Sequence, residues 1–386
     1  MPSSSSRSAM SFRRLGLQNW RNFVALDVAL QRRAFLVGSN ASGKSNLLDV
    51  FRFLRDVASS GGGFEEAVRS RGGVSRIRSL AASRDPSVEI RVVVGDSSDE
   101  WQYLLRFRQE PRGQRRAYVE EEKVWRGGDL ILARPDAGDK QDRARLTQTH
   151  LEQITANVKF RELAEFFATV SYLHVVPQSI REGILSAREH DPYGSDLIER
   201  IARTPARTRD ARLNRIRKAL KVALPQLTDL ELWQDERGVP HLRGKYENWR
   251  DKGVWQGERE FSDGTLRLTG LLWSLLEPGG PLLLEEPEIS LHPGVVEHVP
   301  QVLAQMQLRT GRQTLISTHS PDLLRDAGIG LDEVLVLEPG SEGTQVRRVV
   351  DIPELRELVD GGVPLAEVVL PETRPAEASQ LPFYAR

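Results

Sequence analysis

Residues 33–57 read RAFLVGSNASGKSNLLDVFRFLRDV, with a clear change of pattern in the middle. Residues 33–37 are mostly apolar and predict a short buried strand, whereas residues 47–57 place apolar side chains at helical spacing. Between them, residues 38–45 match the pattern G-x-x-x-x-G-K-[ST], in which a loop of backbone N–H groups surrounds phosphate oxygens. The order strand, glycine-containing loop, helix therefore predicts a P-loop within an α/β fold.

Each residue type in this loop has a chemical role. Gly43 lets the backbone approach a phosphate closely, Lys44 brings a positive charge to the β and γ phosphates, and the Ser45 hydroxyl ligates Mg²⁺. The helix that begins here adds the positive end of its dipole. We therefore expect ATP and Mg²⁺ as cofactors. The expected nucleotide contacts in this loop are Gly38, Ser39, Asn40, Ala41, Ser42, Gly43, Lys44, Ser45 and Asn46.

Two further strand ends carry side chains suited to phosphate chemistry. Residues 281–288 read PLLLEEPE, an aliphatic run that ends in acids, as Walker B strands do. Glu285 would hold Mg²⁺, and Glu286 would polarise the attacking water. Residues 314–320 read TLISTHS and place His319 where it could contact the γ-phosphate or that water. Taken alone, each pattern also fits an ordinary strand that ends in solvated acids or in a structural histidine.

Residues 261–265 read FSDGT and open a predicted helix. Ser262 and Asp263 are good N-cap residues, and Gly264 permits a close backbone approach. Two interpretations stay open. The segment is either a simple helix cap or an ABC signature, whose serine and helix N-terminus are aimed at a γ-phosphate.

The order P-loop, signature, Walker B, histidine resembles that of the ABC-type ATPases. The motifs GSNASGKSN, FSDGT, LLLEEPEISLHP and ISTHSPDLL are similar to those of the RecF and SMC group, and to small bacterial AAA-family ATPases related to the ATPase domain of OLD-family nucleases. The resemblance covers residues 12–350. It implies an α/β P-loop NTPase of the ABC-ATPase head type, with a mixed sheet, helices, and inserted antiparallel β and helical subdomains. No long coiled coil is inserted, so coiled-coil arms are not expected.

The same resemblance assigns further residues. Residues 19–23, NWRNF, resemble a segment of RecF-like heads whose basic residue lies near the nucleotide, which here is Arg21; a surface arginine is the alternative. Gln178, in HVVPQS, becomes a Q-loop residue that touches Mg²⁺. Residues 290–293, SLHP, occupy the D-loop position, which touches the partner subunit. The resemblance thus implies that Glu286, His319 and Lys44 are catalytic, and that Ser45, Gln178 and Glu285 ligate the metal.

Two features depart from the family pattern. Glu285 stands where most ABC proteins have aspartate, but this variant is usual in the resembling group and does not imply inactivity. No TOPRIM nuclease domain follows residue 350, as it does in OLD proteins, so any nuclease would be a separate chain.

Patterning also divides the chain into regions. The predicted division is a disordered N-terminus at 1–13, an ATPase head at 14–365 and a C-terminal tail at 366–386. Within the head we expect a P-loop lobe at 14–84, an inserted β and helical region at 85–250, and a signature and Walker B lobe at 251–350.

Composition limits the function classes. The 386 residues include no cysteine, which excludes disulfides, thiolate metal sites and a cysteine nucleophile. No apolar run approaches the ~20 residues that span a bilayer, so we expect a cytoplasmic protein without a membrane partner. The 54 basic and 54 acidic residues cancel, so any surface for nucleic acid must be local.

Two segments are locally basic. Residues 200–221 contain a single acid, Asp210, and a second cluster lies in residues 69–78. The basic residues are Arg200, Arg203, Arg207, Arg209, Arg212, Arg215, Arg217, Lys218 and Lys221 in the first, and Arg69, Arg71, Arg76 and Arg78 in the second. Such clusters can neutralise DNA phosphates, and a solvated helix face or a surface for an acidic protein are the alternatives.

The sequence thus predicts an ATPase whose heads form a homodimer across ATP and separate after hydrolysis. The cycle is expected to be coupled to DNA sensing or to a partner effector, such as a separately encoded nuclease, in DNA repair or anti-phage defence. A transporter energiser is a second hypothesis, but the EEPEISLHP and FSDGT motifs argue against it. A third is a switch or scaffold that regulates a protein without hydrolysis or DNA, and Glu286 with His319 argue against it.

Overall fold

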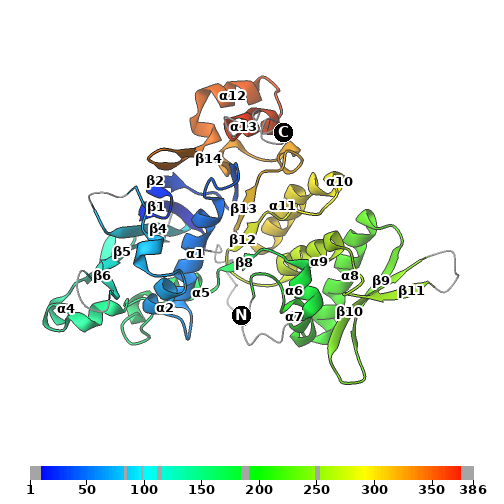
Figure 1. Ribbon diagram of the computed structural model, residues 1–386, viewed down its shortest axis with the longest axis horizontal. Coiled ribbons are helices and arrows are strands. Elements are labelled where there is room, and N and C mark those ends of the chain that lie inside the picture. Colours follow the sequence, from blue (N-terminus) through cyan, green and yellow to red (C-terminus); the bar gives the residue numbers. More distant parts are fainter. Residues whose placement is uncertain are drawn as a thin grey trace, which may run out of the picture.

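The computed structural model describes residues 10–81, 85–96, 99–110, 115–183, 191–247 and 253–374. In Figure 1 an antiparallel sheet lies on one side, the sheet that carries the P-loop in the centre, and a lobe of helices with a small sheet on the other side. The predicted α/β head with a mixed sheet is confirmed. Among the described helices the longest has 18 residues, so the described chain contains no coiled-coil arm.

The first sheet is antiparallel and has the order β2-β1-β4-β5-β6-β7. Its strands are β1 (Phe12–Trp20), β2 (Phe23–Ala29), β4 (Val88–Asp96), β5 (Asp99–Gln109), β6 (Ala117–Arg126) and β7 (Asp129–Arg134). The strands at 88–134 thus extend the sheet that β1 and β2 begin, because β4 pairs directly with β1. The predicted boundary between residues 84 and 85 therefore falls within one sheet, and the fully buried Phe12 lies inside the segment expected to be disordered.

The second sheet carries the P-loop and has the order β15-β14-β3-β13-β12-β8. Its strands are β3 (Arg33–Gly38), β8 (Ser171–Leu173), β12 (Leu282–Glu285), β13 (Thr314–Thr318), β14 (Val334–Gly340) and β15 (Gly343–Arg348). Every pairing is parallel except that of β14 with β15. Parallel strands covered on both faces are continuously apolar, as residues 34–37 (AFLV) and 282–284 (LLL) are.

Helices cover both faces of this sheet. The described helices of the whole chain are α1 (Lys44–Ala58), α2 (Phe64–Arg69), α3 (Val74–Ile77), α4 (Ala137–Gln141), α5 (Arg161–Ala168), α6 (Pro177–Glu182), α7 (Leu197–Arg203), α8 (Ala206–Ala223), α9 (Asp263–Leu276), α10 (Pro293–Val296), α11 (Val299–Thr310), α12 (Pro353–Asp360) and α13 (Leu365–Glu372). Residues 366–372 were expected to begin a tail, but they form α13 because Ala366, Val368 and Val369 are apolar side chains buried against the head. No described helix is long and apolar enough to cross a membrane.

The period-2 geometry of the strands places the P-loop sheet between two hydrophobic cores. On β3, Ala34 and Leu36 join the core formed with α1 and the first sheet, whereas Phe35 and Val37 join the core formed with α9 and α11. The second core continues into a three-stranded sheet of β9 (Leu227–Gln234), β10 (Pro240–Tyr246) and β11 (Val254–Gly257), with α8 packed against β9. The sheet is therefore held rigidly from both faces, and its carboxyl edge is the surface left for chemistry.

A buried ion-pair network joins β6, β7 and α4. The Arg134 guanidinium lies 2.9 Å from both Glu122 and Asp139, and all three side chains are fully buried. Burial alone would raise the pKa of Asp139, but hydrogen bonds from Arg134 and from the Asp136 backbone N–H outweigh it and hold this pKa at about 2. The network therefore keeps its charges inside the protein.

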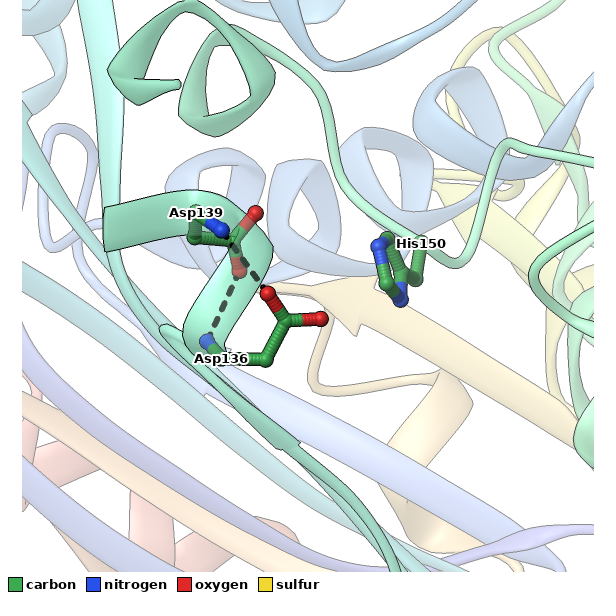
Figure 2. A group of neighbouring side chains, drawn as sticks. All are labelled: Asp136, Asp139 and His150. Carbon is green, nitrogen blue, oxygen red and sulfur yellow. Dashed lines mark hydrogen bonds between the residues drawn. The ribbon is translucent and has the colours of Figure 1, made fainter. Parts of the chain in front are cut away.

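Asp136, Asp139 and His150 could suggest a metal site, because their ligand atoms lie within 4.8 Å of one another. Figure 2 shows, however, that Asp136 and Asp139 cap each other's backbone N–H groups at the start of α4. Both oxygens of Asp139 also accept hydrogen bonds from Arg134. A divalent cation would have to compete with this buried guanidinium, so we assign the cluster a structural role.

We expect Arg134→Met to destabilise the fold by about 3–5 kcal/mol, because it leaves two buried carboxylates without their cation. The matched control is Arg14→Met, which removes a pair with Asp27 in which both side chains are more than half exposed. The control should change stability by about 0–1 kcal/mol. Urea unfolding of both variants measures the difference, and equal midpoints would contradict the structural role of the network.

Candidate nucleotide-binding and catalytic site

The predicted motifs meet at the carboxyl edge of the parallel sheet. The P-loop follows β3, Glu285 ends β12, and His319 follows β13. These strands are neighbours, with Glu285 opposite Ser317 and Thr318 opposite Val37 in the pairing register. Because parallel strands present their carboxyl ends on the same side, three segments distant in sequence converge on one surface.

The P-loop adopts backbone conformations that the sequence pattern requires. Ala41 and Gly43 have φ values of 63° and 101°, in the left-handed region, and α1 begins at Lys44. A Cβ atom at Gly43 would lie 2.0 Å from Asn22 Nδ2, so this position accepts only glycine. The loop therefore has the close packing expected of a phosphate-binding turn.

Lys44 lies at the centre of the P-loop. Its Nζ atom donates hydrogen bonds to the carbonyl oxygens of Gly38 (2.8 Å) and Ser39 (3.0 Å), and the residue is only 6% exposed. Burial lowers the pKa of Lys44, while the nearby carboxylates of the Walker B segment favour its charged form. The loop thus encloses a cation that is suited to phosphate binding.

Glu285 joins three elements. It accepts a hydrogen bond from the Ser45 hydroxyl of α1 and another from the Tyr172 hydroxyl of β8, and His174 Nδ1 lies 3.3 Å from its backbone oxygen. Burial, followed by the hydrogen bond to Glu285, raises the pKa of Tyr172, so the phenol stays protonated. A hydroxyl and a carboxylate in contact are hard oxygen ligands of the kind that Mg²⁺ prefers. The residues present therefore fit the implied metal.

Glu286 and His319 form a pair. His319 Nδ1 lies 2.9 Å from Glu286 Oε1, and the pair is partly exposed. The backbone of Glu286 has a φ of 44°, and its N–H donates to Ser317 O at 3.0 Å. A left-handed conformation is unusual for glutamate and is often found at functional sites. The turn directs the Glu286 carboxylate to the histidine that follows the neighbouring strand.

The FSDGT segment forms the start of α9. Ser262 is the N-cap and accepts a hydrogen bond from the Thr265 backbone N–H, which matches the helix-cap interpretation. A Cβ at Gly264 would lie 2.6 Å from Ser290 O, so the glycine lets the predicted D-loop pack on this helix. Asp263 binds Arg181 at 2.6 Å. The role of Ser262 toward a nucleotide on a second subunit stays a prediction.

Two residues assigned by resemblance make no hydrogen bond to the P-loop or the Walker B acids among the described residues. Gln178 is exposed on α6, and among the described residues no hydrogen bond joins it to the Walker motifs. Arg21 has a φ of 50° and pairs with Asp49 of α1 at 2.8 Å. Their predicted contacts with Mg²⁺ and nucleotide remain predictions.

Two of the four arginines in the second basic cluster are paired within the protein. Arg71 is 7% exposed at its side chain and binds both Asp49 and Asp56 at 2.9 Å. Arg69 pairs with Glu66. These two arginines neutralise acids of α1 and α2. Arg76 and Arg78 have no ion pair among the described residues, so only half of the predicted basic cluster is engaged within the protein.

Sequence reasoning missed the residues that brace the site. Asn22 donates to Ser42 O (3.1 Å) and to Thr344 Oγ1 (2.6 Å), and accepts from the Asn46 side chain (2.7 Å). Asn22 lies in the NWRNF motif, of which only the arginine was assigned a role. The motif itself therefore already marked the segment that contains Asn22. Tyr172 had no such signal, because its role depends on the pairing of β8 with β12.

Fold and site together define a P-loop ATPase of the ABC head type. The family model "AAA domain, putative AbiEii toxin, Type IV TA system" matches residues 33–325, and the chain belongs to this family. Its fold is also that of an SMC-type ATPase head, as the sequence motifs predicted.

A solved structure supports the same fold. The chain is similar to an SMC head bound to the C-terminal winged-helix domain of ScpA, with a TM-score of 0.52, 14% identity, and coverage of 87% of this chain and 96% of the other. It is also similar to the SMC head domain from Thermotoga maritima, with a TM-score of 0.47, 14% identity, and coverage of 87% and 98%. No curated protein shows significant sequence similarity to the chain.

We expect Asn22→Ala to weaken ATP binding roughly tenfold, because the P-loop loses the side-chain bonds that fix Ser42 and Asn46, together worth ~1–2 kcal/mol. Calorimetric titration with a non-hydrolysable ATP analogue measures the change. Asn214→Ala is the control, since Asn214 is exposed on α8 and its side chain bonds, among the described residues, only to Arg217. Equal affinities of Asn22→Ala and wild type would show that the brace does not shape the nucleotide site.

Proposed function

We propose that the chain binds and hydrolyses ATP, and that ATP joins two copies of it. The observation that carries the proposal is the meeting of Ser45–Glu285 and Glu286–His319 in front of one P-loop. A nucleotide site needs a phosphate cradle, metal ligands and a base for water, and these two pairs with Lys44 supply them from adjacent strands.

The chemistry assigns a role to each side chain. Lys44 and the backbone N–H groups of the P-loop bind the β and γ phosphates. Ser45 and Glu285 would hold Mg²⁺, which when bound neutralises phosphate charge. Glu286 accepts a proton from the attacking water, and His319 holds the Glu286 carboxylate in position. Tyr172 keeps one Glu285 oxygen engaged and so fixes the orientation of this carboxylate.

The proposed dimer would bring the start of α9 in one subunit to the nucleotide bound by the other. The FSDGT helix start belongs to the α9 core, and its Ser262 is engaged within its own subunit by Thr265. In an ABC-type arrangement this helix N-terminus faces the γ-phosphate held by the other copy, where its positive dipole stabilises the charge. Hydrolysis removes the shared phosphate and releases the two heads.

A basic face of α8 favours DNA as the molecule that the cycle senses. Five of the nine predicted cations are engaged, as Arg200, Arg203, Arg209 and Arg217 bond within the protein and Arg212 stacks over Trp273. The other four are exposed and have no hydrogen bond or ion pair among the described residues: Arg207, Arg215, Lys218 and Lys221. At 3.6 residues per turn these four fall within an arc of about 120°. The buried Leu213, Ile216 and Leu220 lie on the opposite face.

This arrangement supports DNA-coupled roles such as repair or anti-phage defence, with a separately encoded effector. The alternative of an acidic protein partner predicts the same basic face. DNA is favoured because four unpaired cations on one helix face match a phosphate backbone, in which charges repeat regularly.

We expect Glu286→Gln to retain ATP binding and to lose hydrolysis by ~10²-fold or more, because the amide keeps the side-chain volume but cannot accept the proton. With ATP and Mg²⁺ the variant should form a stable dimer in light scattering after size exclusion. Adding Ser262→Arg should return it to the ATP-free state, whereas Ser75→Arg, an exposed serine of α3, should not. Absence of ATP-dependent assembly in Glu286→Gln would remove the dimer from the proposal.

Changing the four unpaired cations of α8 to glutamine should weaken DNA binding. The slope of log affinity against log salt should fall by roughly 3 to 4, at ~0.9 for each lost phosphate contact. The matched control changes four exposed arginines outside α8: Arg237, Arg259, Arg309 and Arg356. An unaltered slope in the α8 variant would leave this face as a solvated or protein-binding surface.

A further inference from the structure

Glu288 is a buried carboxylate that the proposed mechanism does not use. It is 8% exposed, and one of its oxygens accepts a hydrogen bond from Thr318 Oγ1 at 2.5 Å. The other oxygen, Oε2, is buried and has no hydrogen-bond partner among the described residues. Leaving a buried acceptor unsatisfied costs ~1–3 kcal/mol, so stability alone does not account for a glutamate here.

The position of Glu288 in the chain connects it to the site. Glu286 lies two residues earlier, and Ser290, two residues later, has a φ of 63° and packs its carbonyl oxygen against Gly264 of the signature segment. The Ile289 N–H donates to Glu286 O, and the Leu291 N–H donates to Glu288 O. These bonds make residues 286–291 one compact turn, so a shift of the predicted D-loop moves Glu288.

Thr318 connects this turn to the catalytic histidine. Its hydroxyl donates to Glu288 and also accepts from the Ser320 backbone N–H at 3.0 Å. The two bonds flank His319, whose ring contacts Glu286. Thr318 therefore holds the His319 backbone in position, and its hydrogen bond to Glu288 connects it to the turn that carries the D-loop. Burial raises the pKa of Glu288, and the Thr318 hydrogen bond opposes this shift.

We propose that Glu288 and Thr318 are positioning residues that transmit the placement of the D-loop, residues 290–293, to His319 and Glu286. The inference rests on the proposed hydrolysis of ATP by a dimer. Docking of a second copy on the D-loop would then shift the Glu288–Thr318 bond. Through this bond the pair Glu286–His319 takes its position toward the attacking water when the subunits are joined. Thr318 makes no hydrogen bond to the P-loop among the described residues, so its link should leave ATP binding unchanged. Glu288 acts on Lys44 through its charge, so Thr318→Val is the cleaner test of the link.

The experiment uses Thr318→Val, which keeps the side-chain shape and removes both hydrogen bonds. We expect kcat to fall on the order of tenfold, because small misplacements of catalytic groups have effects of this size or larger. The KM for ATP and the protein concentration at half-maximal activity should stay unchanged. Thr318→Ser restores the hydroxyl and should recover most of kcat. Glu288→Leu should lose as much as Thr318→Val, and the double variant should be no worse than either.

Thr310→Val is a matched control. The Thr310 hydroxyl likewise accepts a hydrogen bond from the N–H two residues later, at 3.2 Å from Arg312 N, and makes no hydrogen bond to the D-loop among the described residues. Its kcat should equal that of wild type. Wild-type kcat in Thr318→Val, or independent effects of Thr318→Val and Glu288→Leu that add in the double variant, would overturn the inference.

A second readout separates this inference from the proposed function. The NMR resonances of the His319 ring, assigned with His319→Gln, should shift in Thr318→Val and keep their wild-type positions in Thr318→Ser and Thr310→Val. A wild-type protein without ATPase activity would refute the proposed function, while these resonances would still report on the link. Unmoved His319 resonances in Thr318→Val would refute the link, whatever the activity.

Discussion

The contact between Ser45 and Glu285 is the interaction on which the rest of the site depends. Ser45 lies in the first turn of α1, the helix that follows β3. Glu285 is the last residue of β12, which lies two places from β3 in the sheet. The contact can form only if β13 lies between β3 and β12 in parallel register, so that their carboxyl ends meet at one edge. This register in turn needs side chains that bury both faces of each strand, which the alternating assignment of Ala34, Phe35, Leu36 and Val37 to two cores provides.

Charge at this edge is balanced by burial and proximity. Burial lowers the pKa of Lys44. Three nearby carboxylates act in the opposite direction and favour its charged form: Glu285, Glu286 and Glu288. The carboxylates differ in their partners, since Glu285 accepts bonds from Ser45 and Tyr172, Glu286 faces His319, and Glu288 bonds to Thr318. Three acids within four positions of one chain segment can therefore have three separate roles, because the neighbouring strands present different donors to each.

The site residues that belong to local sequence motifs could be predicted. Those whose roles depend on which strands lie side by side could not. The P-loop, the Walker B acids and the helix start at Ser262 were found because glycine, acid and cap residues have local conformational meanings. Tyr172 and Thr318 were not identified, since nothing in their own segments shows which strand lies beside them. Arg71 was misjudged for the same reason: the acids that neutralise it lie on α1. The N-terminal sheet was divided at residue 85 because the pairing of β1 with β4 spans a sequence separation that periodicity does not reveal.

The most direct measurement is a calorimetric titration of ATP with Mg²⁺ into the wild-type chain and into Lys44→Ala, with steady-state ATPase activity followed on the same samples. Lys44 is the cation that the P-loop encloses, and no other described lysine or arginine bonds to the carbonyl groups of residues 38 and 39. We expect binding and turnover in wild type and neither in the variant, because the phosphates lose their principal charge partner. Unchanged nucleotide affinity in Lys44→Ala would contradict the assignment of this edge as the nucleotide site.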